Sequence, residues 1–293
     1  MQKLLVVGAV AASLALASCG VSASLDQAVS SLGSSPTVQI DLTANASGTQ
    51  STQAEQILSD VSLDLNYSSA SGAPLSQSQG NINGDVIVNV GSKQLVDLRT
   101  VGNNAYVLFD PTALSSIPSA NVSPTEITTL QLLFGSGWFE FPKSLLEQYA
   151  AQNSATAPSA TTKEKIKAGE LKAISVLSSV IEAAPYTTLA SGGYAQTGSL
   201  ESIVKAELPV INDLTGKTTR LANVKGTYAL TLTMSGSSAT GGSIGITAPN
   251  GTNANQTVTL NATVAHASDN IVAPTNVTIV TPGLLQSLTS GLK

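Results

Sequence analysis

The stretch Val258-Thr259-Leu260-Asn261-Ala262-Thr263-Val264 alternates apolar and polar side chains at every position. Successive side chains of a β-strand point to opposite faces, so this pattern predicts a strand with one apolar and one wet face. Tyr228 to Met234 repeats the alternation, and Ile244 to Ile246 and Val277 to Ile279 predict two shorter strands. Gly- and Asn-rich turns separate these pieces. The last part of the chain is therefore predicted to be an antiparallel sheet.

The same period of two occurs in the first part of the chain, from Thr37 to Asp110. Its clearest segments are Val38 to Ala44, Val61 to Tyr67 and Val86 to Val90. Two further strands, Gln94 to Val101 and Ala105 to Phe109, flank Gly102-Asn103-Asn104, residues that accept positive φ in a hairpin turn. This part of the chain predicts an antiparallel meander.

Helical patterns fill the middle of the chain. Ser123-Pro124-Thr125-Glu126 combines an N-cap serine, a proline at the first helical position and a glutamate at the third, which predicts a helix through Phe134. A second helix is predicted to begin at Pro142, and an apolar stripe from Ile166 to Ala184 predicts a longer one. A further helix is expected over Leu200 to Leu208, where Pro209 should end it.

The order of strands, helices and strands predicts an α+β fold in which both β segments join one antiparallel sheet. The chain of 293 residues contains no internal repeat and no linker rich enough to divide it. We therefore expect a single domain over residues 24–293. It begins with a short amphipathic helix from Ser24 to Leu32, whose first turn carries a capping-box pattern.

Cys19 is the only cysteine, and it ends the run Leu16-Ala17-Ser18-Cys19 after an apolar N-terminal stretch that follows Lys3. This is the layout of a bacterial lipoprotein signal, in which residues 1–18 are cleaved and the thiol is acylated. Residues 19–23 would form a short tether at the extracytoplasmic side of the membrane. The alternative is an ordinary signal peptide with a chance cysteine near its end.

Charged residues are sparse and no basic cluster occurs. The whole chain has a formal net charge of −5, with 13 basic and 18 acidic residues. Nucleic acid is therefore not an expected partner, because phosphate recognition needs clustered Lys and Arg. A mature chain whose single thiol is acylated cannot form an internal disulfide, so its stability must come from packing.

The sequence does not favour an enzyme. His266 is the only histidine, and Ser268 and Asp269 are too close to it along the chain to complete a sensible triad. No Gly-X-Ser-X-Gly elbow occurs, and the carboxylates lack the spacing of a metal site. We expect no cofactor and no metal.

Four segments resemble the LppX/LprG-type bacterial lipoproteins of the LolA/LolB-like lipid-carrier superfamily. They are the helix Leu25-Asp26-Gln27-Ala28-Val29-Ser30-Ser31-Leu32, the strand and turn Val96-Asp97-Leu98-Arg99-Thr100-Val101-Gly102 leading into Tyr106, the Trp138 segment ending in Phe141-Pro142-Lys143-Ser144-Leu145-Leu146, and Gly226-Thr227-Tyr228. The resemblance implies a curved antiparallel half-barrel with helices on its concave face. It also implies an apolar cavity for lipid acyl chains.

On this hypothesis the protein is an envelope lipoprotein that binds a lipid or lipoglycan by its acyl chains, as carrier or presenter, with an envelope transport protein as a further partner. The cavity would be lined by apolar residues of the strands and the long helix: Ile40, Leu42, Val61, Leu63, Leu65, Val86, Val88, Leu98, Tyr106, Leu108, Ile174, Leu177, Ile181, Tyr228, Leu230 and Leu232. The same alternation would also serve a filled core. The alternative function is thus a non-catalytic structural or protein-interaction module.

Overall fold

The computed structural model describes residues 32–48, 59–78, 81–117, 122–135, 137–152, 185–215, 224–236, 238–250, 254–266 and 270–290, with seven residues between 164 and 180. They belong to two compact units. The meander unit comprises Gly33–Thr43, Thr52–Ala157 and Ala265–Lys293; the α7 unit, named after helix α7 (Leu200–Thr215), comprises Met1–Leu32, Ala44–Ser51 and Pro158–Val264. No single cut separates them, and the single domain stays a prediction.

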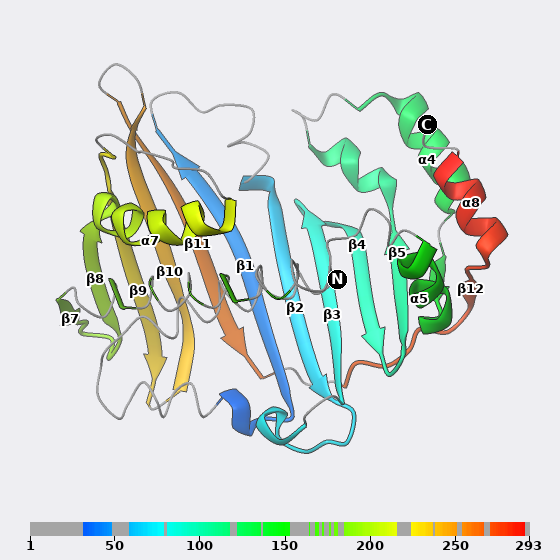
Figure 1. Ribbon diagram of the computed structural model, residues 1–293, viewed down its shortest axis with the longest axis horizontal. Helices are drawn as coiled ribbons and strands as arrows, with labels where there is room; N and C mark the ends of the chain where they lie inside the picture. The colour runs from blue at the N-terminus through cyan, green and yellow to red at the C-terminus, as the bar shows by residue number, and fades with distance from the viewer. Residues whose placement is uncertain are drawn as a thin grey trace. The chain divides into compact units, whose positions relative to one another are not determined.

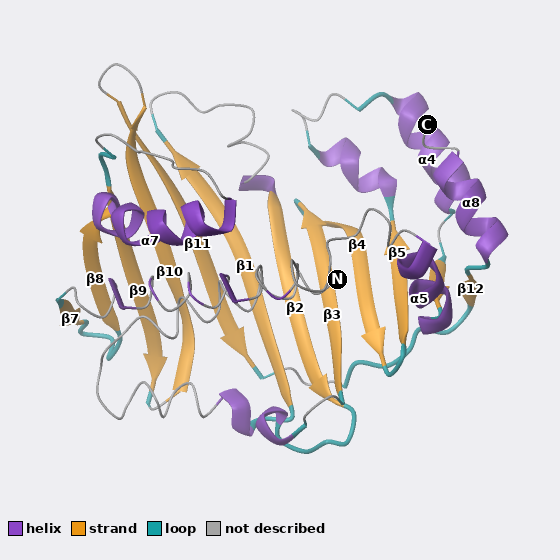
Figure 2. Ribbon diagram, viewed as in Figure 1, coloured by secondary structure: helices purple, strands orange, loops and turns teal. Residues whose placement is uncertain are grey.

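The meander unit contains a row of mostly antiparallel strands in the order β12-β6-β5-β4-β3-β2-β1 (Figures 1 and 2). Their bounds are β1 (Thr37–Ser47), β2 (Val61–Ser69), β3 (Ile82–Val90), β4 (Lys93–Val101), β5 (Asn104–Phe109), β6 (Trp138–Phe141) and β12 (Val277–Ile279). Short 3₁₀ helices η1 (Leu75–Gln77) and η2 (Pro111–Ser116) and helices α4 (Pro124–Phe134), α5 (Lys143–Gln152) and α8 (Pro282–Ser290) complete the unit. β12 pairs with β6 in parallel, whereas the pairs from β1 to β6 are antiparallel.

The α7 unit contains antiparallel strands in the order β11-β10-β9-β8-β7. These are β7 (Tyr186–Thr188), β8 (Tyr194–Ser199), β9 (Thr227–Ser235), β10 (Ser238–Asn250) and β11 (Ala254–Ala265). On one face of β9, Tyr228 is 1 % and Leu230 6 % exposed, and both pack with Leu200 and Ile203 of α7 and Ile244 of β10. The alternation predicted for β9 therefore produces a filled contact between helix and strand.

The α+β class and the mostly antiparallel strands are confirmed. Helix α4 begins as predicted: Ser123 Oγ accepts from Glu126 N–H, and the Glu126 carboxylate accepts from Ser123 N–H. The long stripe that begins at Ile166 is helical at each of its described positions. The helix predicted at the N-terminus lies outside the described residues, apart from Leu32.

The prediction that Pro209 ends its helix is wrong. Pro209 lies inside α7, which continues to Thr215. The pyrrolidine ring removes one backbone donor, but Pro209 is exposed, while Val210 next to it is only 2 % exposed. Burial of Val210 helps to hold the next turn in place. Three short strands, β6, β7 and β8, were not predicted.

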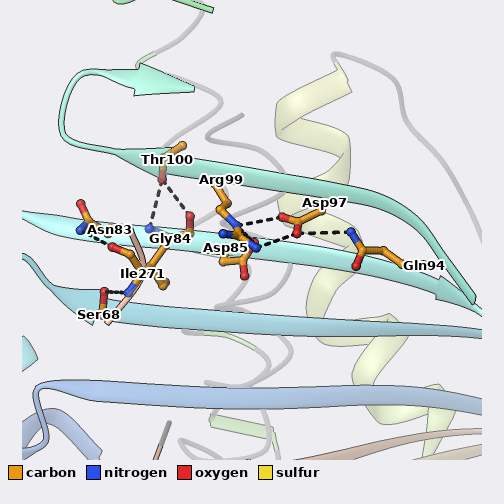
Figure 3. A network of polar contacts seen from close by, with 9 residues as sticks. All are labelled: Ser68, Asn83, Gly84, Asp85, Gln94, Asp97, Arg99, Thr100 and Ile271. Carbon is orange, nitrogen blue, oxygen red and sulfur yellow. Dashed lines mark hydrogen bonds and ion pairs between the residues drawn. The ribbon is translucent and has the colours of Figure 1, made fainter. Parts of the chain in front are cut away.

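A C-terminal segment contacts polar side chains near the end of β2 and the start of β3 (Figure 3). Ile271 N–H donates to Ser68 Oγ at 3.0 Å, and Asn83 Nδ2 donates to Ile271 O at 3.0 Å. The segment then forms β12, after which Val280 N–H donates to Glu140 O of β6 at 2.8 Å. These contacts place β12 beside β6.

Candidate functional site

The hairpin β4–β5 sets which side chains share a face. Val101 is paired with Asn104, and Gly102 between them has a φ of 58°, the left-handed region in which a glycine has no Cβ penalty. From this register Leu98 is opposite Val107 and Val96 is opposite Phe109. Apolar side chains of β5 on the Leu98 face are therefore those at odd positions.

Strand β6 and helix α4 extend this apolar face. In β6, Phe139 is opposite Val107 and Phe141 is opposite Ala105. In α4, Leu130 and Phe134 lie one turn apart and so share a face. The helix ends at Gly135, whose φ of 63° turns the chain back toward β6, while Gly135 N–H donates to Gln131 O.

These elements enclose an open apolar pocket of about 360 Å³. Its lining residues come from β4, β5, α4 and β6, and they are Val96, Val107, Phe109, Leu130, Phe134, Phe139 and Phe141. All four phenylalanines of the chain are among them. The wall that these described residues form exposes no polar atom. Each of the seven is only half-buried, as expected for side chains that border an open space.

Phe134 is the centre of the aromatic wall. Its ring centroid lies 5.1 Å from that of Phe109 at an interplanar angle of 77°, and 6.4 Å from that of Phe139 at 88°. Edge-to-face pairs of this kind contribute roughly 0.5–1.5 kcal/mol each beyond area burial. The two contacts therefore connect α4 to β5 and β6.

A second pocket, of about 500 Å³, lies at the other end of α4. Its lining is mixed and comes from η2, α4 and the segment between them: Thr112, Leu114, Ser115, Ile117, Val122, Pro124, Ile127 and Thr128. The hydroxyls of Ser115 and Thr128 donate to backbone carbonyls of their own helices, at 2.6 and 2.9 Å. This pocket therefore offers a less uniform surface to an apolar ligand than the aromatic one.

The opposite face of the same strands carries a buried charge network (Figure 3). Asp97 is 2 % exposed and accepts from Arg99 at 2.9 Å and from Gln94 Nε2 at 3.3 Å. Arg99 Nε lies 3.5 Å from Asp85 Oδ1, but that oxygen has no hydrogen-bond partner among the described residues. The Arg99 guanidinium also lies over the Trp138 ring, 4.6 Å from its centroid. One cation thus serves two buried carboxylates.

Burial is the largest cause that raises the pKa of Asp85, to about 7. The hydrogen bond and negative charge of Asp97 raise the pKa further, while Arg99 and Asn66 offset part of the increase. The protonated form of Asp85 is therefore favoured more strongly in the folded protein than at an exposed carboxyl. The network is placed on the face away from the aromatic pocket, because Asp85 is opposite Arg99 and Asp97 is opposite Leu108.

Most predicted residues of the meander strands share the sheet face of the pocket. Two cross-strand rows show this: Ile40, Leu65, Val86, Leu98, Val107 and Phe139 form one, and Leu42, Leu63, Val88, Val96 and Phe109 form the other. Val61 lies two positions before Leu63 and so points the same way. Ile40 and Leu65 are buried, and the pocket lies at the β4–β6 end of the rows. The seven lining residues themselves were not predicted.

Tyr106 and Leu108 are wrongly assigned to that face. Tyr106 is opposite Arg99 and Glu140, and Leu108 is opposite Asp97, so both point to the charged side. The prediction assigned the even-numbered residues of β5 to the cavity side of the sheet. A two-residue turn at Gly102-Asn103 would have fixed Val107 opposite Leu98, and that signal was present in the sequence.

The remaining predicted residues lie elsewhere. Tyr228, Leu230 and Leu232 are buried in the α7 unit. Ile174, Leu177 and Ile181 lie outside the described residues, as does Cys19. Their proposed roles stay predictions.

His266 is exposed. No group of three or more His, Cys, Asp or Glu residues in the part of the chain that the structure describes could hold a metal ion. None of its helices is long and apolar enough to cross a membrane.

Neither known protein families nor curated proteins match the chain. Among solved structures, the Mycobacterium tuberculosis lipoprotein LppX is similar, with a TM-score of 0.33 and 10 % sequence identity. The matched region covers 86 % of this chain and 97 % of LppX. Similarity at this level assigns neither a family nor a ligand to the chain.

Proposed function

We propose that this protein is a membrane-anchored envelope lipoprotein that binds a lipid or lipoglycan by an acyl chain, as carrier or presenter. The observation that carries the proposal is the aromatic pocket, where all four phenylalanines line one open apolar space. Pockets of roughly 300–1,000 Å³ are the usual size for small ligands. A wall without polar atoms selects hydrocarbon, because a buried polar group would lack a partner.

The proposal includes the features expected from the sequence. Acylated Cys19 would anchor the chain on the extracytoplasmic side of the membrane, and an envelope transport protein would deliver or receive the lipid. The curved, LolA-like half-barrel and the absence of catalysis belong to the same proposal. Burial of hydrocarbon at roughly 0.8 kcal/mol per methylene supplies affinity without a reaction or a specific polar contact.

A matched pair of variants in α4 tests the proposal. Leu130 lines the pocket, whereas Leu132 is 82 % exposed two residues later. Leu130→Trp should fill the pocket and abolish binding of a fluorescent acyl probe with little loss of stability. Leu132→Trp adds the same side chain outside the pocket and should leave binding unchanged.

The full chain, expressed in a bacterial host with Cys19→Ser to remove the predicted acylation site, should also retain lipid in native mass spectrometry. Leu130→Trp should be recovered without it. Repeated recovery of lipid-free protein that binds no acyl probe would reject the proposal. It would favour the alternative of a structural or protein-interaction module.

A further inference from the structure

We infer that the aromatic pocket takes a single hydrocarbon chain and contacts about fourteen of its carbon atoms, an inference that rests on the proposed function. An apolar cavity of roughly 150 Å³ takes up benzene, with its six carbons. By proportion, the 360 Å³ of this pocket holds about fourteen carbons. The pocket therefore sets an upper limit on the length of chain that it can bury.

The same volume argues against two chains side by side. Divided between two chains, it would bury only about seven carbons of each, by the same proportion. A second chain would also bring a second polar end group close to the pocket wall, which exposes no polar atom among its described residues. One chain, with its polar end in solvent at the open side, satisfies both constraints.

Chain length should therefore control affinity in two regimes. Within the pocket, each added methylene should raise affinity about fourfold, the factor that corresponds to burial of one methylene. Beyond about fourteen carbons the added methylenes leave the pocket and stay in water, so affinity should stop rising. The position of this break is the measurable signature of the pocket volume.

The test uses the full chain carrying Cys19→Ser, stripped of bound lipid. Saturated fatty acids of about ten to about twenty carbons compete at equal free concentrations below their micelle thresholds, and native mass spectrometry reports occupancy and stoichiometry. We expect one fatty acid per protein and a break near fourteen carbons. Two chains per protein, or affinity that rises up to the longest acid, would overturn the inference and leave the proposed function intact. Failure to bind any fatty acid would reject the function itself.

Two variants in β5 test whether the pocket sets the chain length at which affinity stops rising. Val107→Phe places a larger side chain in the lining, so the break should move to shorter chains. Leu108→Phe is the control, since Leu108 lies next to it on the charged face. An unchanged break in Val107→Phe would overturn the inference. If that variant does not fold, Val96→Leu makes a smaller change in the same lining and should shift the break in the same direction.

Discussion

Helix α7 and helix α4 each pack on an apolar strand face, but only α7 makes a filled contact. Tyr228 and Leu230 under α7 are 1 % and 6 % exposed. Leu130 and Phe134 of α4 are half-buried and face a pocket of about 360 Å³. Both regions have strands with apolar alternation. In the α7 unit the apolar face forms a packed core, whereas in the meander unit it lines an open pocket.

The difference arises from the neighbours of the aromatic rings rather than from their number. The ring of Tyr228 lies where a Cβ on Gly198, its cross-strand partner, would collide with it. Because Gly198 has no side chain, the Tyr228 ring can lie directly against the β8 backbone. In the meander unit, the Phe134 ring instead meets those of Phe109 and Phe139 edge to face.

The largest expected effect compares one substitution in the two regions. Leu230→Ala should lower the free energy of unfolding by roughly 2–5 kcal/mol, the range for a leucine in a packed core. Leu130→Ala should cost about 1 kcal/mol, because its side chain is only partly withdrawn from water. Urea denaturation followed by circular dichroism measures both, and Leu132→Ala is the exposed control, expected within about 0.5 kcal/mol of wild type. Equal losses for Leu230→Ala and Leu130→Ala would mean that the pocket region is packed like a core.

Both regions bury polar atoms without a hydrogen-bond partner among the described residues, including Asp85 Oδ1 in the meander unit and Tyr228 Oη in the α7 unit. Burying an unsatisfied polar atom opposes folding. The two atoms should differ in pH dependence, because only the carboxyl titrates near neutrality. This extends the comparison from apolar packing to buried polar groups.

Asp85→Asn should change how stability depends on pH. The folded protein keeps the Asp85 proton up to a pKa of about 7, whereas the ordinary value is 3.8. The folded state thus binds more protons between these values, so its free energy of unfolding should fall as pH rises from about 4 to about 7, by at most roughly 1.4 kcal/mol per pH unit. The variant should lose this slope.

Chemical denaturation at several pH values measures the slope, with Asp110→Asn as a control at an exposed carboxyl. Asp110 caps η2 through its contact with Thr112, so a small loss of stability is expected there. An unchanged slope in Asp85→Asn would show that another group titrates.

Sequence reasoning predicted most of the strands and the α4 cap because both depend on local patterns. Val258 to Val264 alternates without a break, and Ser123 and Glu126 satisfy each other three residues apart. The pocket was missed because it depends on contacts between distant segments. Phe109, Phe134 and Phe139 meet only once the β4–β5 register and the turn at Gly135 are set. Hydrophobic alternation indicates which face is apolar, but not whether the facing helix closes on it.

The smallest expected effect concerns the filled contact. Tyr228→Phe keeps the ring against Gly198 and removes only the buried hydroxyl. Since that hydroxyl has no partner among the described residues, its removal should leave stability unchanged or raise it by up to about 1 kcal/mol. The midpoint of urea denaturation, at an unchanged m-value, measures this.

Tyr228→Ala is the matched contrast, because it removes the ring as well and should cost at least as much as Leu230→Ala, roughly 3–5 kcal/mol. A clear loss in Tyr228→Phe would mean that the hydroxyl is hydrogen-bonded in solution. The contact under α7 would then depend partly on a polar interaction, and its contrast with the aromatic pocket could no longer be attributed to apolar packing alone.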